Sequence, residues 1–178
     1  FFHFGALRHI ILTFALRNCK CMNRISTRIR QSLRDIYPPE ELKALTMMIC
    51  CDMLGFDPLD IYLGKDMILS ECKERELENI IFRLQKNEPI QYIRGFAVFG
   101  GRKFKVAPGV LIPRPETAEL VDWVVNENPG AHHLLDIGTG SGCIAISLDK
   151  RLPDADVEAW DISEEALAIA RTNNEELE

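Results

Sequence analysis

The 178-residue sequence lacks features that would place it in several broad classes of protein. It has no apolar run long enough to cross a bilayer near its start, because the run from Ile10 to Leu16 is far shorter than the roughly 20 residues that a spanning helix needs. It has no basic excess, since 21 Lys and Arg stand against 27 Asp and Glu, and the net charge of −6 argues against a nucleic-acid binder with a broad basic face. We therefore expect a globular protein that works as a monomer in the cytoplasm, without a membrane or direct nucleic-acid partner.

The cysteines show no spacing typical of a metal site. Cys19 and Cys21 are one residue closer together than a usual zinc pair, and no His or Cys follows them at a suitable distance. Cys50 and Cys51 are adjacent within an apolar helical pattern. We predict reduced, partly buried thiols and no metal.

Residues 1–21 contain no acidic residue and no small-x-small cleavage pattern. Their basic residues weakly resemble an organelle presequence. Met22 is followed by a polar, soluble stretch and has the character of a natural start. We therefore expect residues 1–21 to be a non-native or disordered extension.

A glycine-rich turn carries the strongest chemical signal of the sequence. Residues 134–143 predict a buried strand that ends in Asp136, a turn with glycines at 138, 140 and 142, and the start of a helix. A dinucleotide fingerprint would place its third small residue at 143, which is Cys, and a carboxylate inside the turn would repel a pyrophosphate. A carboxylate suits a cationic cofactor instead, so the turn favours S-adenosylmethionine, with its sulfonium and amino groups.

A second acid follows the next predicted strand, residues 155–161, at Asp161. We expect its carboxylate to accept hydrogen bonds from the ribose hydroxyls of the cofactor. The predicted cofactor-binding residues are Asp136, Gly138, Thr139, Gly140, Ser141, Gly142 and Asp161. The alternatives are an ordinary glycine turn with a strand-end Asp, or an NAD-binding site.

The pattern along the chain predicts an α/β protein with three parts after the extension. Residues 22–88 have the apolar spacing of four short amphipathic helices and predict a small helical bundle. In this bundle the second helix is expected to run from Pro39 to Gly55, and Ser70 is expected to cap the fourth. Residues 89–113 predict a β-hairpin linker that turns at Gly100-Gly101. Residues 114–178 predict the first, incomplete part of a Rossmann-like class I S-adenosylmethionine-dependent methyltransferase domain, with Ser163 as the cap of its last helix.

Five segments resemble one family in their order and spacing: Pro89-Ile90-Gln91-Tyr92-Ile93, Gly95, Phe99-Gly100, Leu111-Ile112-Pro113-Arg114-Pro115-Glu116-Thr117, and Asp136 to Gly142. The family is the release-factor glutamine N5-methyltransferases (HemK/PrmC), and the resemblance covers about residues 22–178. The segment that ends at Thr117 is the most specific part. The sequence departs from many members at Ala118, where they carry Glu.

The resemblance implies methyl transfer from S-adenosylmethionine to the side-chain amide of the glutamine in the Gly-Gly-Gln motif of class 1 peptide release factors. It implies that the helical domain binds the release factor. It also implies that Arg114, Pro115, Glu116 and Thr117 line the cleft beside the cofactor.

The family's Asn-Pro-Pro-Tyr motif, which orients the acceptor amide, does not occur in the 178 residues. We therefore predict no catalytic residue in this chain, a donor half-site without an acceptor site, and an inactive fragment. With only the strands at 133–137 and 155–161, we expect residues 114–178 to expose apolar surface or a sheet edge. Two alternatives stay open: a methyltransferase for another protein or for a nucleic-acid amine, and a non-enzymatic module that binds release factors.

Overall fold

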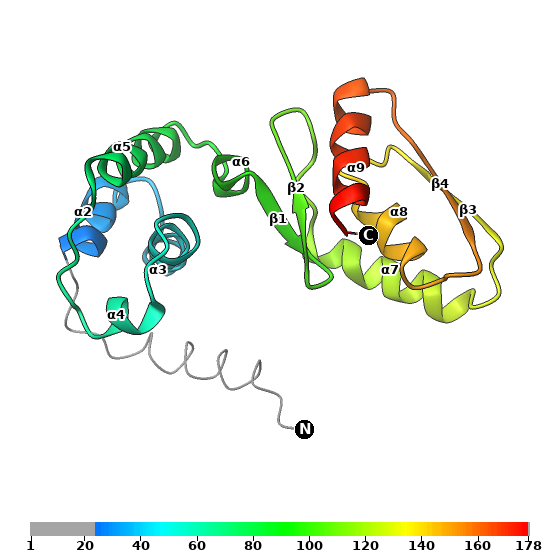
Figure 1. The fold of residues 1–178 in the computed structure, drawn as a ribbon, viewed down its shortest axis with the longest axis horizontal. Coiled ribbons are helices and arrows are strands. Elements are labelled where there is room, and N and C mark those ends of the chain that lie inside the picture. Colours follow the sequence, from blue (N-terminus) through cyan, green and yellow to red (C-terminus); the bar gives the residue numbers. More distant parts are fainter. Residues whose placement is uncertain (1–23, 178) are drawn as a thin grey trace. The chain divides into compact units, whose positions relative to one another are not determined.

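The computed structural model describes residues 24–177 and divides into two compact units, one on each side of the Ile90–Gln91 bond (Figure 1). The first unit is helical. Its elements are α2 (Arg24–Leu33), α3 (Pro39–Met47), the π-helical segment η1 (Met48–Met53), α4 (Pro58–Tyr62) and α5 (Glu71–Gln85). Residues 1–21, which we expected to be an extension, lie outside the described residues.

Local signals explain where these helices begin. Pro39 opens α3, and the Asp57 carboxylate accepts the Leu59 N–H at 2.7 Å to cap α4. Ser70 caps α5 through the Lys73 N–H at 3.4 Å, as its sequence predicted. Each helix buries an apolar stripe. In α5 the stripe consists of Leu77, Ile80, Ile81 and Leu84.

The second predicted helix differs from expectation in its last part. We expected one regular helix from Pro39 to Gly55, but the chain widens into η1 after Met47. The Leu54 N–H donates to the Ile49 carbonyl five residues earlier, at 2.9 Å. The adjacent residues Ile49 and Cys50 of η1 are both fully buried, so the widened segment still contributes to the core of the first unit.

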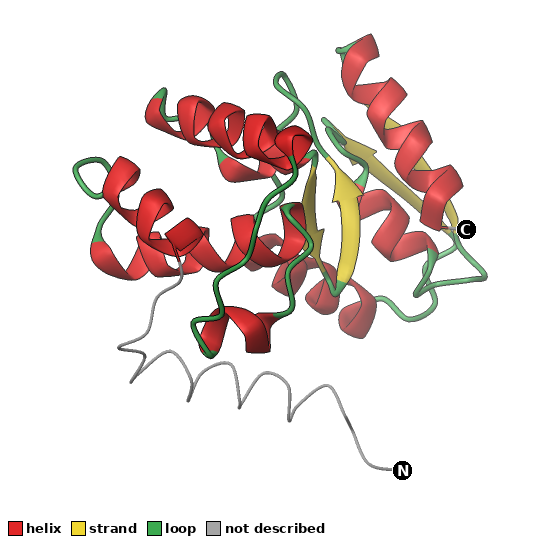
Figure 2. Cartoon of the chain, turned by 60° about the vertical axis from the view of Figure 1, so that its left-hand side comes forward, coloured by secondary structure: helices red, strands yellow, loops and turns green. Residues whose placement is uncertain are grey.

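The second unit contains a hairpin and a parallel strand pair, which form separate sheets (Figure 2). A short helix, α6 (Ile90–Arg94), precedes the antiparallel strands β1 (Phe96–Phe99) and β2 (Arg102–Lys105). Then follow α7 (Pro115–Glu127), β3 (His133–Ile137), α8 (Cys143–Asp149), β4 (Asp156–Trp160) and α9 (Glu164–Leu177). The predicted hairpin is confirmed, with Gly100 and Gly101 both at positive φ in its two-residue turn.

The parallel pair β3–β4 positions the candidate site. Its register places Asp136 opposite Ala159 and Ile137 opposite Trp160, so both strands end at the same edge of the sheet. Helix α9 begins as predicted at Ser163, whose hydroxyl accepts the Ala166 N–H at 3.2 Å. The predicted α/β class is confirmed.

The core of the second unit surrounds the rings of Phe99 and Phe104, which meet edge to face with centroids 5.9 Å apart. Val121 of α7 and Ile146 of α8 complete its buried centre. Ala118, one turn before Val121, packs against this cluster as a small apolar side chain.

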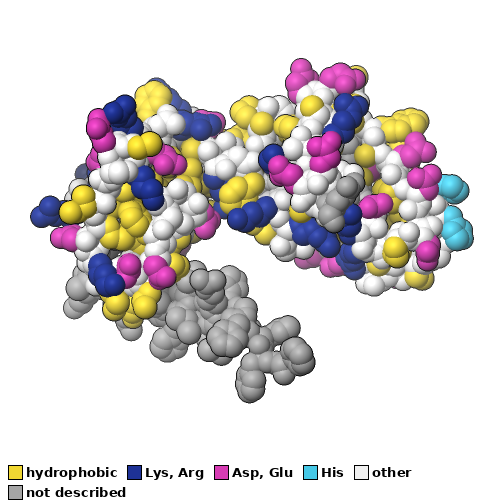
Figure 3. All heavy atoms as spheres, in the orientation of Figure 1, with side chains coloured by type: hydrophobic (Ala, Val, Ile, Leu, Met, Phe, Trp, Pro, Cys, Tyr) yellow, Lys and Arg dark blue, Asp and Glu magenta, His cyan; other side chains and the backbone are white. Residues whose placement is uncertain are grey.

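The β3–β4 sheet has an exposed apolar surface, which the sequence predicted. Ile137 is 75% exposed and Trp160 is 56% exposed, although both end strands of a parallel sheet. Figure 3 shows hydrophobic side chains, in yellow, on the visible surfaces of both units. Within residues 24–177, none of the helices has the length and apolar character needed to span a bilayer.

Candidate functional site

The glycine loop, residues 138–142, folds over the carboxyl end of β4. The N–H groups of Gly138 and Thr139 both donate to the Trp160 carbonyl, at 2.8 and 2.9 Å. The Gly142 N–H closes the loop on the Thr139 carbonyl at 2.9 Å. These bonds fix the loop between the two carboxylates predicted to bind the cofactor.

Asp136 lies half-buried at the start of the loop. Its Oδ2 accepts the Thr139 hydroxyl at 2.7 Å, and Thr139 is itself buried. A carboxylate has about four lone-pair positions, so this bond leaves capacity for further donors. The Asp136 side chain is therefore oriented by the loop and remains able to accept a cationic ligand group.

Asp161 lies on the other side of the loop and is bound to it. Its Oδ2 accepts the Gly140 N–H at 2.8 Å, and its Oδ1 accepts the Ser163 N–H at 2.9 Å. The N–H groups of Ser163 and Gly140 hold the pKa of Asp161 below its ordinary value, because they stabilise the charged form. The carboxylate is thus ionised at neutral pH, and besides its expected role toward a ligand it holds the loop.

The three glycines of the loop have different surroundings, although all have positive φ. A Cβ on Gly138 would meet no atom within 4 Å, and one on Gly140 would meet only Val110, at 3.8 Å. A Cβ on Gly142 would lie 3.0 Å from Ile146 and 3.1 Å from the Ala170 Cβ. Gly142 therefore allows α8 and α9 to pack closely, whereas Gly138 leaves open space beside the backbone and Gly140 has only an ordinary contact with Val110.

This open space and the two carboxylates together fit S-adenosylmethionine. Side chains at positions 138 and 140 would fill the space through which a ligand reaches the loop backbone. The flanking carboxylates are negatively charged hydrogen-bond acceptors, which suits a ligand with a sulfonium, an amino group and ribose hydroxyls, and disfavours a pyrophosphate.

The end of the loop is buried. Ser141 is 2% exposed, and its carbonyl accepts a hydrogen bond from the Asn173 side chain at 2.8 Å. Burial raises the pKa of the adjacent Cys143 thiol, so this cysteine is a protonated core residue. Among the described residues, no group of three His, Cys, Asp or Glu side chains is placed to hold a metal ion.

The predicted cleft residues lie at the start of α7. Arg114 precedes the helix in an extended conformation, Pro115 is its first residue, and the Thr117 N–H donates to the Arg114 carbonyl at 3.1 Å. Arg114, Pro115 and Glu116 are exposed, and Thr117 is half-buried. They are therefore accessible to a partner.

Sequence reasoning missed Val110 and Tyr92, of which Val110 lies beside the glycine loop. Val110 is the side chain nearest to Gly140, and its carbonyl accepts the Tyr92 hydroxyl of α6 at 2.7 Å. Tyr92 belongs to one of the segments that carry the family resemblance, but nothing in its local pattern indicates a bond to a residue 18 positions away.

Comparisons with known families agree with both halves of this description. The model of the PrmC N-terminal domain matches residues 25–95. The model of the methyltransferase small domain matches residues 115–178. The second match contains the glycine loop and both carboxylates.

The chain is also similar to curated proteins named release factor glutamine methyltransferase. It is 82% identical to the one from Bacteroides thetaiotaomicron over 157 residues, which are 88% of this chain and 56% of that protein. It is 41% identical to the one from Flavobacterium psychrophilum over 152 residues, which are 83% of this chain and 53% of the relative. The chain thus spans about half the length of these relatives. Together, the two family models and these relatives show that the chain belongs to the release factor glutamine methyltransferase family.

Proposed function

We propose that the protein containing this chain transfers a methyl group from S-adenosylmethionine to the side-chain amide nitrogen of a glutamine, the one in the Gly-Gly-Gln motif of class 1 peptide release factors. The observation that carries the donor assignment is the glycine loop between two carboxylates, with open space at Gly138 and no close neighbour at Gly140. The relatives' shared name supports the acceptor assignment.

The proposed donor site uses each group for a different part of the ligand. Asp136 accepts hydrogen bonds from the ammonium group of the methionine moiety, and Asp161 accepts from the ribose hydroxyls. Thr139 and Ser141 form part of the glycine loop beside the ligand, and the Thr139 hydroxyl orients Asp136. Gly142 allows the loop to lie close against α9. Ile162, next to Asp161, is fully exposed and offers an apolar surface for the adenine ring.

When bound, S-adenosylmethionine would supply an electrophilic methyl carbon. The amide nitrogen would form a bond to that carbon, the electron pair of the broken carbon–sulfur bond would stay on sulfur, and the nitrogen would lose a proton to solvent. The chain's contribution is to fix the donor, because alignment for in-line attack accounts for a large part of such a barrier. An amide lone pair is delocalised, so the acceptor also needs groups that orient it. The proposed motif for that task, Asn-Pro-Pro-Tyr, is not among these 178 residues.

The remaining assignments follow from this function. We place the release factor against the helical domain, residues 22–88, and against the accessible side chains of Arg114, Pro115, Glu116 and Thr117. A substrate that takes part in translation is available in the cytoplasm, which is where we place the protein, as a monomer.

The test is methyl transfer from radiolabelled S-adenosylmethionine by the full-length protein. A class 1 release factor is the substrate, and the same factor with Glu in place of the Gly-Gly-Gln glutamine is the control. Label on that glutamine alone is the expected result. Label on the control factor would reject the proposed acceptor, and an absence of S-adenosylmethionine binding would reject the donor site. The 178-residue chain by itself is expected to transfer no methyl group.

A further inference from the structure

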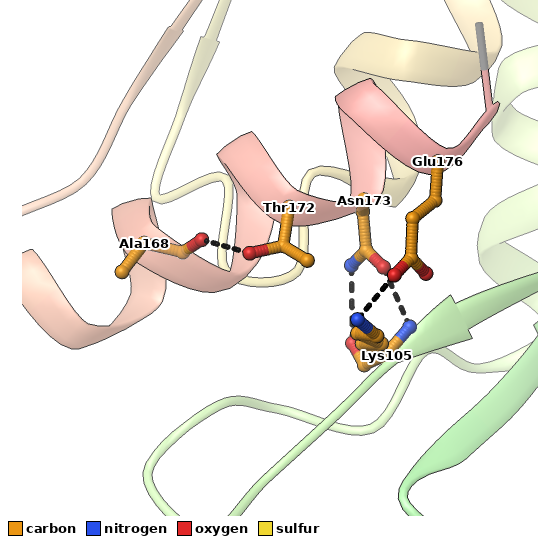
Figure 4. A network of polar contacts seen from close by, with 5 residues as sticks. All are labelled: Lys105, Ala168, Thr172, Asn173 and Glu176. Carbon is orange, nitrogen blue, oxygen red and sulfur yellow. Dashed lines mark hydrogen bonds and ion pairs between the residues drawn. The ribbon is translucent and has the colours of Figure 1, made fainter.

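The buried side chain of Asn173, on α9, makes hydrogen bonds to residues outside its own helix. Its side chain is 1% exposed and makes three bonds, all to main-chain groups. Figure 4 shows the two that it makes with Lys105. Helix formation uses none of them. A buried amide that is satisfied by main chain far away in the sequence connects separate parts of a fold.

The first two bonds hold strand β2. The Lys105 N–H donates to Asn173 Oδ1 at 2.6 Å, and Asn173 Nδ2 donates to the Lys105 carbonyl at 3.1 Å. The amide therefore satisfies both main-chain groups of one strand residue, as a neighbouring strand would. The ion pair between Lys105 Nζ and Glu176 lies beside them but is exposed and contributes little.

The third bond holds the glycine loop. Asn173 Nδ2 also donates to the Ser141 carbonyl at 2.8 Å. One turn earlier on the same helix, Ala170 is the residue that a side chain at Gly142 would meet. Helix α9 thus contacts two consecutive loop residues, one through a hydrogen bond and one through close packing.

We propose that Asn173 is a positioning residue for the methyl donor: by binding Ser141 and Lys105 at once, it locks the glycine loop to the β1–β2 hairpin. The inference rests on the proposed donor site. Asn173 acts on the donor through the glycine loop, because it holds the carbonyl of Ser141, which lies in that loop between Gly140 and the start of α8. The Gly140 N–H, which binds Asp161, is one residue from the fixed carbonyl, so a shift of the loop would also move the carboxylate that faces the donor.

Asn173→Asp tests this with little change in side-chain size. The carboxylate can still accept the Lys105 N–H, but it cannot donate to the carbonyls of Ser141 and Lys105, and it places negative charge against both. The matched control is Thr172→Ala, because Thr172 donates only to the Ala168 carbonyl of its own helix, at 2.9 Å (Figure 4). Each variant is made in the full-length protein.

Steady-state kinetics give the first readout. N173D is expected to raise the KM for S-adenosylmethionine about tenfold or more and to leave the KM for the release factor unchanged. The loss of two buried hydrogen bonds, with a negative charge placed against their acceptors, has an effect of this magnitude. T172A is expected to change neither value. If N173D does not fold, Asn173→Ser, which removes the bridging amide without adding charge, replaces it.

A purely structural role would give a different result. Phe104→Leu creates a core defect in the same unit and serves as a control of similar instability. If F104L and the Asn173 variant, compared at equal loss of thermal stability, raise the KM for S-adenosylmethionine equally, the positioning role is refuted.

Hydrogen exchange separates this inference from the proposed function, because it needs no cofactor. Asn173 variants are expected to lose amide protection in residues 138–146 and 103–106 together, while T172A keeps both. Independent changes in the two segments would overturn the proposed lock. If the wild-type protein showed the joint protection but did not bind S-adenosylmethionine, the proposed donor site would fail and the lock would stand as a structural feature only.

Discussion

Replacement of Gly142 by alanine is the sharpest test of how the glycine loop is built. Gly142 has φ of +78°, a conformation that costs an alanine about 1–2 kcal/mol. Its Cβ would also lie 3.0 Å from Ile146 and 3.1 Å from Ala170, closer than ordinary contact distance. The Ala170 Cβ is fixed to its backbone and cannot rotate away, so α9 itself would have to give by a few tenths of an ångström.

Gly138 supplies a matched control, because it has the same kind of backbone without the contact. Its φ is +80°, and a Cβ there would meet nothing within 4 Å. Gly138→Ala should therefore cost only the backbone strain, about 1–2 kcal/mol. Overpacking adds about 1–3 kcal/mol, which brings Gly142→Ala to a total of about 2–5 kcal/mol.

Urea unfolding followed by circular dichroism measures both costs in the full-length protein. Calorimetry with S-adenosylhomocysteine measures the effect on binding. Gly142→Ala should destabilise the protein more than Gly138→Ala, whereas Gly138→Ala should weaken binding more than its small stability loss explains, because its Cβ enters the open space beside the loop. Equal losses of stability in the two variants would refute the assignment of Gly142 to helix packing.

Three further predictions concern acids and thiols. Asp161→Ala should weaken S-adenosylhomocysteine binding about 10- to 100-fold by calorimetry, and unchanged affinity would exclude its proposed contact with the ribose. The N–H groups of Ser163 and Gly140 lower the pKa of Asp161, so its carboxylate should stabilise the fold at all pH values above its unfolded pKa and lose this effect as pH falls through the lowered folded value. The carboxylate therefore stays charged from about pH 8 to about pH 5, and the affinity for S-adenosylhomocysteine should stay constant over that range. A loss of affinity within it would contradict the assigned charge state. Burial raises the pKa of the Cys51 thiol to about 11. Alkylation at about pH 8, mapped by mass spectrometry, should therefore modify the exposed Cys72 well before Cys51. The reverse order would show that Cys51 is not protected.

The sequence was sufficient where the structure depends on neighbours in the chain. Ser70 and Ser163 cap helices as predicted, because a cap needs only the next three residues. The strands predicted at 133–137 and 155–161 are found at 133–137 and 156–160; the second alternates polar and apolar residues from Asp156 to Ala159. The glycine turn and its two acids could be found for the same reason.

The rest depends on contacts between distant residues. Asn173 binds main chain 68 and 32 residues away, and in the sequence it is only a polar residue of an amphipathic helix. The different roles of Gly138 and Gly142 could not be predicted either, because only the position of α9 places Ala170 against Gly142. Periodicity could not reveal η1 either, since a π-helical turn breaks the spacing on which such predictions rest.

The π-helical segment η1 has a consequence for variation in length. A π-turn holds one residue more than an α-turn over the same rise, so a helix can gain or lose a residue there while the elements on either side keep their orientation. Relatives that are one residue shorter between Met47 and Leu54 should therefore retain the same helical bundle with a regular helix in this place. Insertions elsewhere in α3 would instead rotate its apolar face by about 100° and expose the core.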